Sequence, residues 1–216
     1  MKFEIIHDPV EVIIIRDVFS KEVNKSILEE SIKNESSFKE AMTIDKNVSQ
    51  KYRNNTTSMY DIMYAGNRNE SILLKSIDEM FKLDSSFNEL LLSSKYPVSE
   101  FGSSNFHETQ VSRYGDDGQS YKYHIDRFTN TSRQTTMVYY FNEEPKKYKG
   151  GKLVLTDSPI IKGETVDINA KTLSIDPENN MAVIFPSGIP HMVEPTTSSN
   201  VFSEGRLSVN IWIGRK

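Results

Sequence analysis

From about residue 106 onward, the chain is a succession of short runs rich in β-branched and aromatic residues, separated by turn-forming residues. Many short strands at this spacing are typical of a sandwich or jelly roll, and not of a parallel α/β sheet. Tight turns are expected at Gly115–Gly118, Gly150–Gly151 and Pro177–Asn180. The expected strands are 106–114, 121–127, 134–142, 152–156, 165–168, 171–175, 181–185, 190–194 and 206–213.

The first half of the chain is expected to be mostly helical, because apolar residues recur at helical spacing after Ser20, which fits a helix N-cap. Residues 34–57 are rich in Ser, Asn and Thr and are expected to form a loop. The other expected elements are a strand over 10–16, a short strand near Thr57–Tyr60, a helix from Asn69 to about Lys82 and a short helix over 86–93. The two halves together predict helices that support a β-sandwich, within a single domain of 216 residues.

The composition excludes several kinds of site. The chain has no cysteine, which removes disulfides, thiolate metal sites, iron–sulfur clusters and cysteine nucleophiles. The same absence fits a reducing compartment, and we expect a cytoplasmic protein. No signal peptide is expected, and no segment approaches the roughly 20 apolar residues of a membrane helix. With 26 basic and 30 acidic residues, the net charge of −4 argues against nucleic-acid binding.

Two histidines and one aspartate are the candidate metal ligands. His124 and Asp126 are two residues apart in an expected strand, so their side chains are expected to share one face. His191 follows the rigid turn 186–190 and is the best candidate for a third ligand. Two neutral imidazoles and one carboxylate leave coordination positions open, as in non-haem Fe(II) oxygenases.

Simpler interpretations compete with this metal site. A lone His-x-Asp often forms an ordinary surface pair. The two remaining histidines of the chain, His7 and His107, have no matching partner in the sequence and are expected to be structural. Zinc accepts the same ligand set. A zinc hydrolase normally adds a carboxylate as general base, however, and Glu194 is expected to face away from His191. Iron is therefore preferred.

The expected strand that starts at Arg206 alternates polar and apolar residues with period two. The residues on its polar face are Arg206, Ser208, Asn210 and Trp212. A solvent-facing strand has the same alternation, but a tryptophan on the polar face favours an enclosed pocket of mixed polarity. Because a guanidinium binds a carboxylate through two parallel hydrogen bonds, Arg206 is expected to hold the far end of a dicarboxylate, with Ser208 as a further donor.

In order and spacing, these residues and their surroundings resemble the prolyl 4-hydroxylase-like branch of the 2-oxoglutarate- and Fe(II)-dependent dioxygenases, over roughly residues 108–214. The segments that carry the resemblance are 112–126, 133–142, 150–153, 182–191 and 205–213. One departure is the stretch between His191 and Arg206, which is longer than in the oxygen-sensing relatives and predicts a loop insertion.

The resemblance implies an α+β fold that is mainly β, a double-stranded β-helix of the jelly-roll or cupin type with supporting N-terminal helices. In this arrangement residues 1–105 supply helical support and a substrate rim, and residues 106–216 form the β-helix core. The implied cofactors are Fe(II) and 2-oxoglutarate, with ascorbate as a candidate reductant. Iron would be held by His124, Asp126 and His191, and 2-oxoglutarate by Tyr114, Tyr140 and Arg206.

Several residues keep two interpretations. Arg133 matches a position that approaches the substrate in the family, but a structural ion pair fits it equally well. Trp212 is expected to flank the metal on the substrate side. Tyr60 ends a polar and aromatic stretch, 47–60, that suits either a substrate rim or a solvated loop. Core packing is the alternative role for Tyr114 and Tyr140, and the preferred role for Tyr121.

The implied activity is hydroxylation of a C–H bond, with a prolyl residue in a peptide or protein as the first candidate substrate. The carboxylate of Asp126 favours hydroxylation over halogenation, because a small residue there would open a site for halide. The alternatives are hydroxylation of another side chain, a free amino acid or a small metabolite, and a non-catalytic jelly-roll binding module. A nucleic-acid or membrane partner is not expected.

Overall fold

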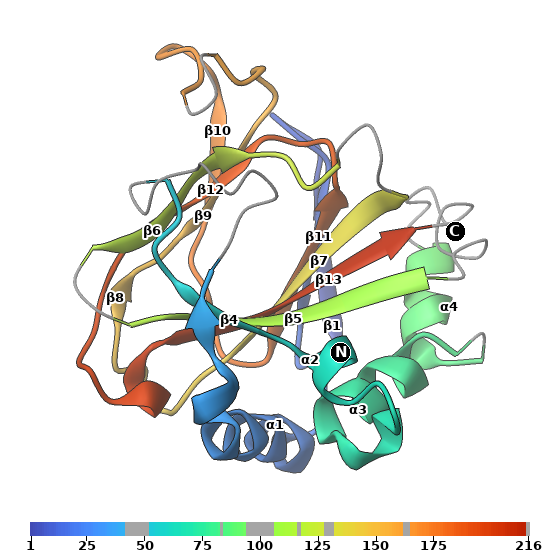
Figure 1. Cartoon of the computed structure of the whole chain (residues 1–216). Coiled ribbons are helices and arrows are strands. Elements are labelled where there is room, and N and C mark those ends of the chain that lie inside the picture. Colours follow the sequence, from blue (N-terminus) through green and yellow to red (C-terminus); the bar gives the residue numbers. More distant parts are fainter. Residues whose placement is uncertain are drawn as a thin grey trace.

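The computed structural model describes residues 1–41, 52–82, 84–93, 106–115, 118–127, 132–161 and 165–214. Two antiparallel β-sheets lie against each other, and the helices pack on the outer face of the larger sheet (Figure 1). The expected fold, mainly β and of the jelly-roll double-stranded β-helix type with N-terminal supporting helices, is confirmed.

The spatial order of the strands brings together segments that are far apart in the sequence. The larger sheet consists, in spatial order, of β1 (Lys2–Ile6), β2 (Val12–Arg16), β11 (Met181–Pro186), β7 (Arg133–Phe141), β13 (Arg206–Gly214), β5 (Phe106–Tyr114), β4 (Thr56–Met59) and β3 (Lys39–Glu40). The smaller sheet consists of β10 (Thr172–Ile175), β9 (Leu153–Thr156), β12 (His191–Thr197) and β6 (Gln119–His124), with β8 (Lys149–Gly150) paired to β12. Strands β6 and β12 thereby become neighbours, and β13 lies between β7 and β5.

Two of the α-helices begin after a serine whose side chain caps the first turn. The Ser20 hydroxyl accepts a hydrogen bond from the Val23 amide at 3.2 Å, and Ser71 accepts one from Leu74 at 3.1 Å. The helical elements are α1 (Lys21–Lys33), α2 (Tyr60–Met63), α3 (Ile72–Met80) and α4 (Ser86–Ser93), with short 3₁₀ turns η1 (Glu35–Ser37), η2 (Arg68–Glu70) and η3 (Phe202–Glu204).

Residues 12–15 of strand β2 are all apolar, which lets both faces of the strand be buried. Ile13 and Ile15 belong to the core between the larger sheet and the helices, whereas Val12 and Ile14 belong to the core between the two sheets. Strand β7 alternates in the same way and turns Tyr140 toward the space between the sheets. This inner space is where the functional residues of the smaller sheet meet those of the larger one.

Most expected elements are present, with corrected bounds. The helix expected over 69–82 divides into η2 and α3. The strand expected at 165–168 is wrong, because Thr165 makes only an isolated bridge to Ile161, in an arm between β9 and β10 that projects from the sheets (Figure 1). Ile168 is 96% exposed in this arm, so its β-branched side chain packs against no surface that would favour a strand. Strand β1 and helix α2 have no counterpart among the sequence predictions.

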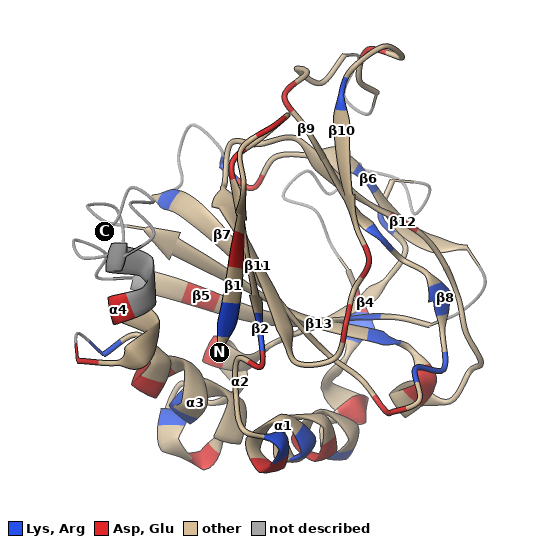
Figure 2. Ribbon diagram, turned by 180° about the vertical axis from the view of Figure 1, so that it is seen from behind, with Lys and Arg blue, Asp and Glu red and all other residues tan. Residues whose placement is uncertain are grey.

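The described residues leave out parts of two expected loops. Residues 42–51 include part of the expected substrate rim, and 116–117 lie inside the expected turn after β5; both segments lie outside the described residues. Within the described chain, no helix is long and apolar enough to cross a membrane. Basic and acidic residues both lie along α1, at the bottom of Figure 2.

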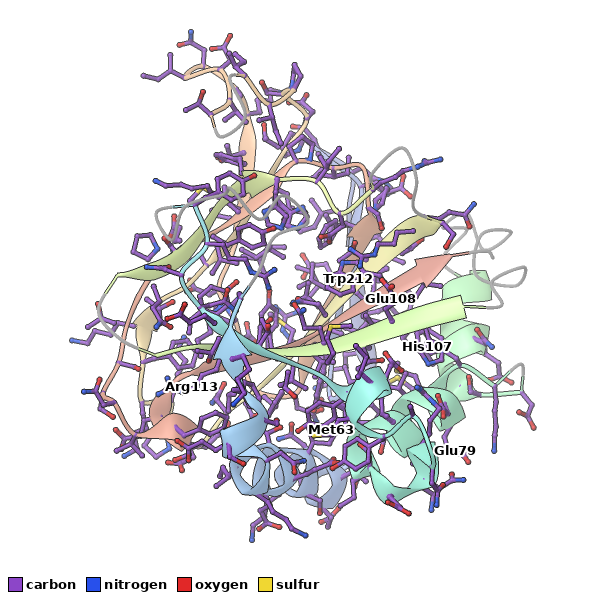
Figure 3. The ribbon with its side chains drawn as sticks, in the orientation of Figure 1. Met63, Glu79, His107, Glu108, Arg113 and Trp212 are labelled. Atoms are coloured by element: carbon purple, nitrogen blue, oxygen red, sulfur yellow. The ribbon has the colours of Figure 1, made fainter. Side chains whose placement is uncertain are left out.

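His107, expected to be structural, joins an ion cluster on the helix side of β5 (Figure 3). Its Nε2 atom lies 2.8 Å from Nη2 of Arg68 and 3.2 Å from Oδ1 of Asp78. Arg68 also pairs with Asp61, and the Phe81 ring packs on the imidazole with centroids 5.8 Å apart. The cluster links α2 and α3 to the edge of the β core.

Acid destabilisation is expected from this cluster. Burial lowers the pKa of His107 below its ordinary value, and the Arg68 guanidinium lowers it further. As the pH falls, the unfolded chain therefore binds a proton here before the folded chain does, and stability is lost below about pH 6.5. Urea unfolding is expected to show a smaller free energy at about pH 5.5 than at about pH 7.5, with a shallower decline in His107→Gln. Identical declines in both proteins would exclude His107 as a source.

Candidate metal and co-substrate site

Three candidate ligands converge where the smaller sheet faces the larger one. Strand β6 ends at His124 and β12 begins at His191, and their antiparallel register pairs these two residues directly. Asp126 follows two residues after β6, with carboxylate oxygens 3.9 Å from Nε2 of His124 and 3.5 Å from Nε2 of His191. The three ligand atoms all lie within 4.8 Å of one another, and all three residues are buried. The expected convergence is present.

The reason for the convergence differs from the one expected. Asp126 does not share a strand face with His124, because β6 stops at His124. Instead, the backbone amides of Asp126 and Arg127 both donate to the carbonyl of Ser187, at 2.9 and 3.0 Å. Ser187 belongs to the turn that leads into His191. One carbonyl therefore fixes the aspartate next to the segment that delivers the second histidine.

The imidazoles are oriented for metal binding. Nδ1 of His124 lies 2.8 Å from the Lys122 carbonyl, and Nδ1 of His191 lies 2.8 Å from the Ile189 carbonyl. Nδ1 then carries the proton in each ring, and the Nε2 lone pairs face Asp126. Burial holds the pKa of His124 well below its ordinary value, and His191 lowers it further, so His124 is a neutral ligand.

Asp126 is held in its ionised form. Burial alone raises the pKa of its carboxyl group, but the neighbouring His191 and His124 outweigh burial, and the pKa is lowered. The Thr136 hydroxyl donates to Oδ2 at 2.8 Å and lies 2.9 Å from the Ser187 hydroxyl. Two neutral nitrogen donors and one oriented carboxylate oxygen fit a divalent metal ion with open coordination positions.

Thr136 is a supporting residue that the sequence predictions do not include. Thr136→Val keeps the size of the side chain but removes the hydrogen bond to Asp126, so the carboxylate loses its fixed orientation. We expect Mn(II) affinity to fall by roughly 10- to 100-fold, as is typical for partners of metal ligands. Calorimetric titration with Mn(II) measures this effect, and Thr57→Val on β4 is a control. Unchanged affinity would show that Thr136 does not support the ligand.

Arg206 lies in a second cluster, which we call the Arg206 cluster: Arg206, Ser208, Tyr114 and Tyr140. Arg206 is 1% exposed; its Nε donates to the Gly151 carbonyl at 2.7 Å and its Nη1 to the Ser208 hydroxyl at 3.2 Å. The guanidinium carbon lies 4.9 and 5.0 Å from the ring centroids of Tyr114 and Tyr140. These tyrosines thus contact the cation through their rings.

The Arg206 cluster fits an anionic ligand. Among the residues that the structure describes, none gives Arg206 an ion pair, and the buried Tyr140 hydroxyl has no hydrogen-bond partner. A buried charge without a partner is unfavourable, so the arrangement is suited to an added carboxylate. Burial raises the pKa of Tyr114, and both Arg206 and Asp126 act on it, which puts Tyr114 within electrostatic reach of both clusters.

The three weaker substrate candidates, Trp212, Arg133 and Tyr60, do not all lie near the candidate ligands. Trp212 lies beside Asp126 and stacks under Arg133, whose guanidinium carbon is 3.9 Å from the indole centroid. Arg133 also pairs with Glu108 at 2.5 Å, and Figure 3 shows Glu108 and Trp212 side by side on β5 and β13. The ion-pair interpretation of Arg133 thus describes the structure. Tyr60 is not brought to the site: it is fully buried in the helix-side core.

Two residues near the ligands have a larger part than the sequence indicates. Tyr121, for which core packing is the preferred prediction, stacks on His124 with ring centroids 3.5 Å apart. The guanidinium carbon of Arg53 lies over the Tyr121 ring, 4.6 Å from its centroid, and the guanidinium donates to the side-chain oxygens of Asn55 and Gln110, both at 2.9 Å. Arg53 follows an irregular polar stretch, and no periodicity there predicts its position.

The fold and the site together define a jelly-roll protein with a two-histidine, one-aspartate metal site. Residues 109–214 match the family model of the 2OG-Fe(II) oxygenase superfamily, and this segment contains all three candidate ligands and Arg206. The chain belongs to this superfamily. The resemblance to prolyl 4-hydroxylase-like dioxygenases is confirmed at the level of the family, and the family implies Fe(II) and 2-oxoglutarate.

Similar proteins agree with this assignment. An uncharacterised PKHD-type hydroxylase of Synechocystis sp. is 38% identical over 112 residues, which are 50% of this chain and 36% of that protein. The match thus spans about a third of the relative's length.

Solved structures share the fold. A Pseudomonas putida prolyl-4-hydroxylase has a TM-score of 0.63 at 20% identity, over 95% of this chain and 92% of the other. A Trichoplax adhaerens prolyl hydroxylase, solved with a hypoxia inducible factor peptide fragment, has a TM-score of 0.63 at 18% identity, over 94% of this chain and 83% of the other. The α-ketoglutarate-dependent epimerase SnoN has a TM-score of 0.61 at 11% identity, over 94% of this chain and 76% of the other. Because the last is an epimerase, this fold alone does not define the reaction.

Proposed function

We propose that this protein is an Fe(II)- and 2-oxoglutarate-dependent oxygenase that hydroxylates a C–H bond. The observation that carries the proposal is the presence of two clusters, three buried candidate ligands whose ligand atoms lie within 4.8 Å of one another and a buried guanidinium without a carboxylate among the described residues. Tyr114 contacts the guanidinium and also interacts electrostatically with Asp126. The first cluster suits a divalent metal, and the second suits the far carboxylate of a 2-oxo dicarboxylic acid.

Each residue has a defined task in this proposal. Nε2 of His124, Nε2 of His191 and a carboxylate oxygen of Asp126 hold the metal on one face. Arg206 binds the far carboxylate of 2-oxoglutarate and fixes its orientation, and the burial of the cluster excludes water. With both groups bound, the site would supply oxidative chemistry in which dioxygen is the oxidant: one of its oxygen atoms ends in succinate, formed together with CO₂ from 2-oxoglutarate, and the other enters the C–H bond of the substrate.

For the substrate, we propose a prolyl residue in a peptide or protein. Support comes from the prolyl hydroxylases that share the fold and from the peptide complex in which one of them was solved. It also comes from the aromatic and cationic side chains near the candidate ligands, Tyr121, Arg53 and Trp212, which suit a peptide backbone and a proline ring. A small-molecule substrate is the second candidate, favoured by the epimerase that shares the fold.

The test has two stages. Purified protein with Fe(II), ascorbate and 2-oxoglutarate should form succinate above the level without Fe(II), and a proline-containing peptide library should increase that rate. Mass spectrometry should then find peptides heavier by about 16 Da, one oxygen atom, with the modification on proline. Succinate formation without peptide modification would direct the search to small molecules. No succinate at all would favour a binding module.

A further inference from the structure

Tyr148, which none of the sequence predictions includes, lies in the segment between β7 and β8 and is 3% exposed. Its hydroxyl is buried and makes no hydrogen bond among the described residues. Burial raises the pKa of this phenol to about 12, and the Arg206 charge acts in the opposite direction. Tyr148 in turn contributes to the raised pKa of Tyr140. The Tyr148 hydroxyl is therefore close enough to the Arg206 cluster to interact electrostatically with it.

The turn that follows Tyr148 packs directly on Arg206. A Cβ atom on Gly151 would lie 2.5 Å from Cδ of Arg206 and 2.8 Å from Oγ1 of Thr196, so only glycine allows this approach. Gly151 has a φ of +70°, and its carbonyl accepts the hydrogen bond from Nε of Arg206. Thr196 pairs with Gly150 across β8 and β12. Tyr148, Thr196 and Arg206 thus border the same turn.

Unpaired hydroxyl groups gather at this point. Within the described part of the chain, four buried hydroxyls have no hydrogen-bond partner: that of Thr109, on β5, and those of Tyr140, Tyr148 and Thr196, which belong to the Arg206 cluster or to the turn beside it. Buried polar groups in folded proteins are nearly always paired, so such a group near a buried cation calls for an explanation. A carboxylate is one ligand that satisfies both features, because it accepts several hydrogen bonds and carries the opposite charge.

We propose that Tyr148, with Thr196 beside it, donates a hydrogen bond to the far carboxylate of the 2-oxo acid and makes the site selective for a dicarboxylic co-substrate. This inference rests on the proposed function, since it assigns residues to the same co-substrate. Tyr148 then acts as a specificity-determining residue. Its hydroxyl contributes only when the acid carries a second carboxylate, because the keto-acid end of the ligand lies at the metal.

The test compares two acids that differ at the far end. Calorimetric titration of the Mn(II)-loaded protein without oxygen gives the dissociation constants of 2-oxoglutarate and of 2-oxopentanoate, which has a methyl group in place of the far carboxylate. In Tyr148→Phe, the affinity for 2-oxoglutarate should fall by roughly 10-fold, as expected for one hydrogen bond to a charged group, and that for 2-oxopentanoate should change by less than about twofold. Tyr123→Phe, which removes a half-buried phenol near Glu194, should change neither.

Each outcome separates this inference from the function on which it rests. If the unaltered protein binds 2-oxoglutarate and Tyr148→Phe binds it equally well, the inference fails and the proposed function stands. Equal weakening for both acids would also overturn the inference, because the hydroxyl would then act through the fold. If the unaltered protein binds neither acid, the proposed function fails too. If Tyr148→Phe does not fold, Thr196→Val is titrated with both acids instead. Its affinity for 2-oxoglutarate should fall while its affinity for 2-oxopentanoate should not.

Discussion

Asp126→Ala is expected to abolish metal binding and 2-oxoglutarate turnover while the protein remains folded. Without the carboxylate, two neutral imidazoles remain, and the site loses its only negative charge among the three ligands. We expect Mn(II) affinity to fall by about 100-fold or more, because even the loss of a partner of a metal ligand costs 10- to 100-fold. The fold should survive, since the backbone amide of Asp126 keeps its hydrogen bond to Ser187.

Calorimetric titration with Mn(II) and a succinate assay measure these effects together. The matched control is Asp8→Ala, which removes a well-exposed aspartate that pairs with Lys171 on the surface. That variant should bind metal as the unaltered protein does. Metal binding of undiminished strength in Asp126→Ala would mean that the ion is held elsewhere, and the assignment of all three ligands would then fall.

Arg206→Ala is expected to weaken 2-oxoglutarate binding by roughly 30-fold or more, which corresponds to about 2 kcal/mol. The guanidinium is the only cation of the Arg206 cluster, and its remaining donors have no carboxylate among the described residues. Metal affinity should change little, because Arg206 contacts none of the three ligands in the structure.

The measurement is the dissociation constant of 2-oxoglutarate for the Mn(II)-loaded variant, checked by thermal unfolding. Arg16→Ala is the control, since Arg16 pairs with Glu4 and Glu178 on the surface. A third variant, Arg206→Lys, keeps the positive charge but loses the two parallel hydrogen bonds of a guanidinium. Its affinity for 2-oxoglutarate should therefore lie between those of the unaltered protein and Arg206→Ala. An Arg206→Ala variant that binds the acid as tightly as before would remove Arg206 from the proposed role.

The ligand residues could be predicted from the sequence because metal chemistry limits the residue types and their number. The geometry that unites them could not. The prediction placed His124 and Asp126 on one strand face, whereas the strand ends at His124 and a shared carbonyl of Ser187 positions Asp126. Such a contact depends on a turn more than sixty positions away in the sequence, and no local pattern encodes it.

The same limit explains the residues that were missed. Tyr148 and Arg53 carry no periodic or motif signal. Thr136 lies in the segment 133–142 that carries the family resemblance, but, as with the other two residues, its role depends on a neighbour that the fold supplies. Tyr60 is the converse case. An aromatic residue at the end of a polar stretch suggested a substrate contact, but Tyr60 is the first residue of α2. Its hydroxyl lies in the helix-side core, near Asn34 and Ser31.

A crystal structure of the protein with Mn(II) and 2-oxoglutarate, grown without oxygen, tests the central claim most directly. The proposed function predicts one metal ion bonded to Nε2 of His124, Nε2 of His191 and a carboxylate oxygen of Asp126. It also predicts that the far carboxylate of the acid pairs with the Arg206 guanidinium. A metal ion bound away from these three side chains, or an acid whose carboxylates both avoid Arg206, would contradict the proposal.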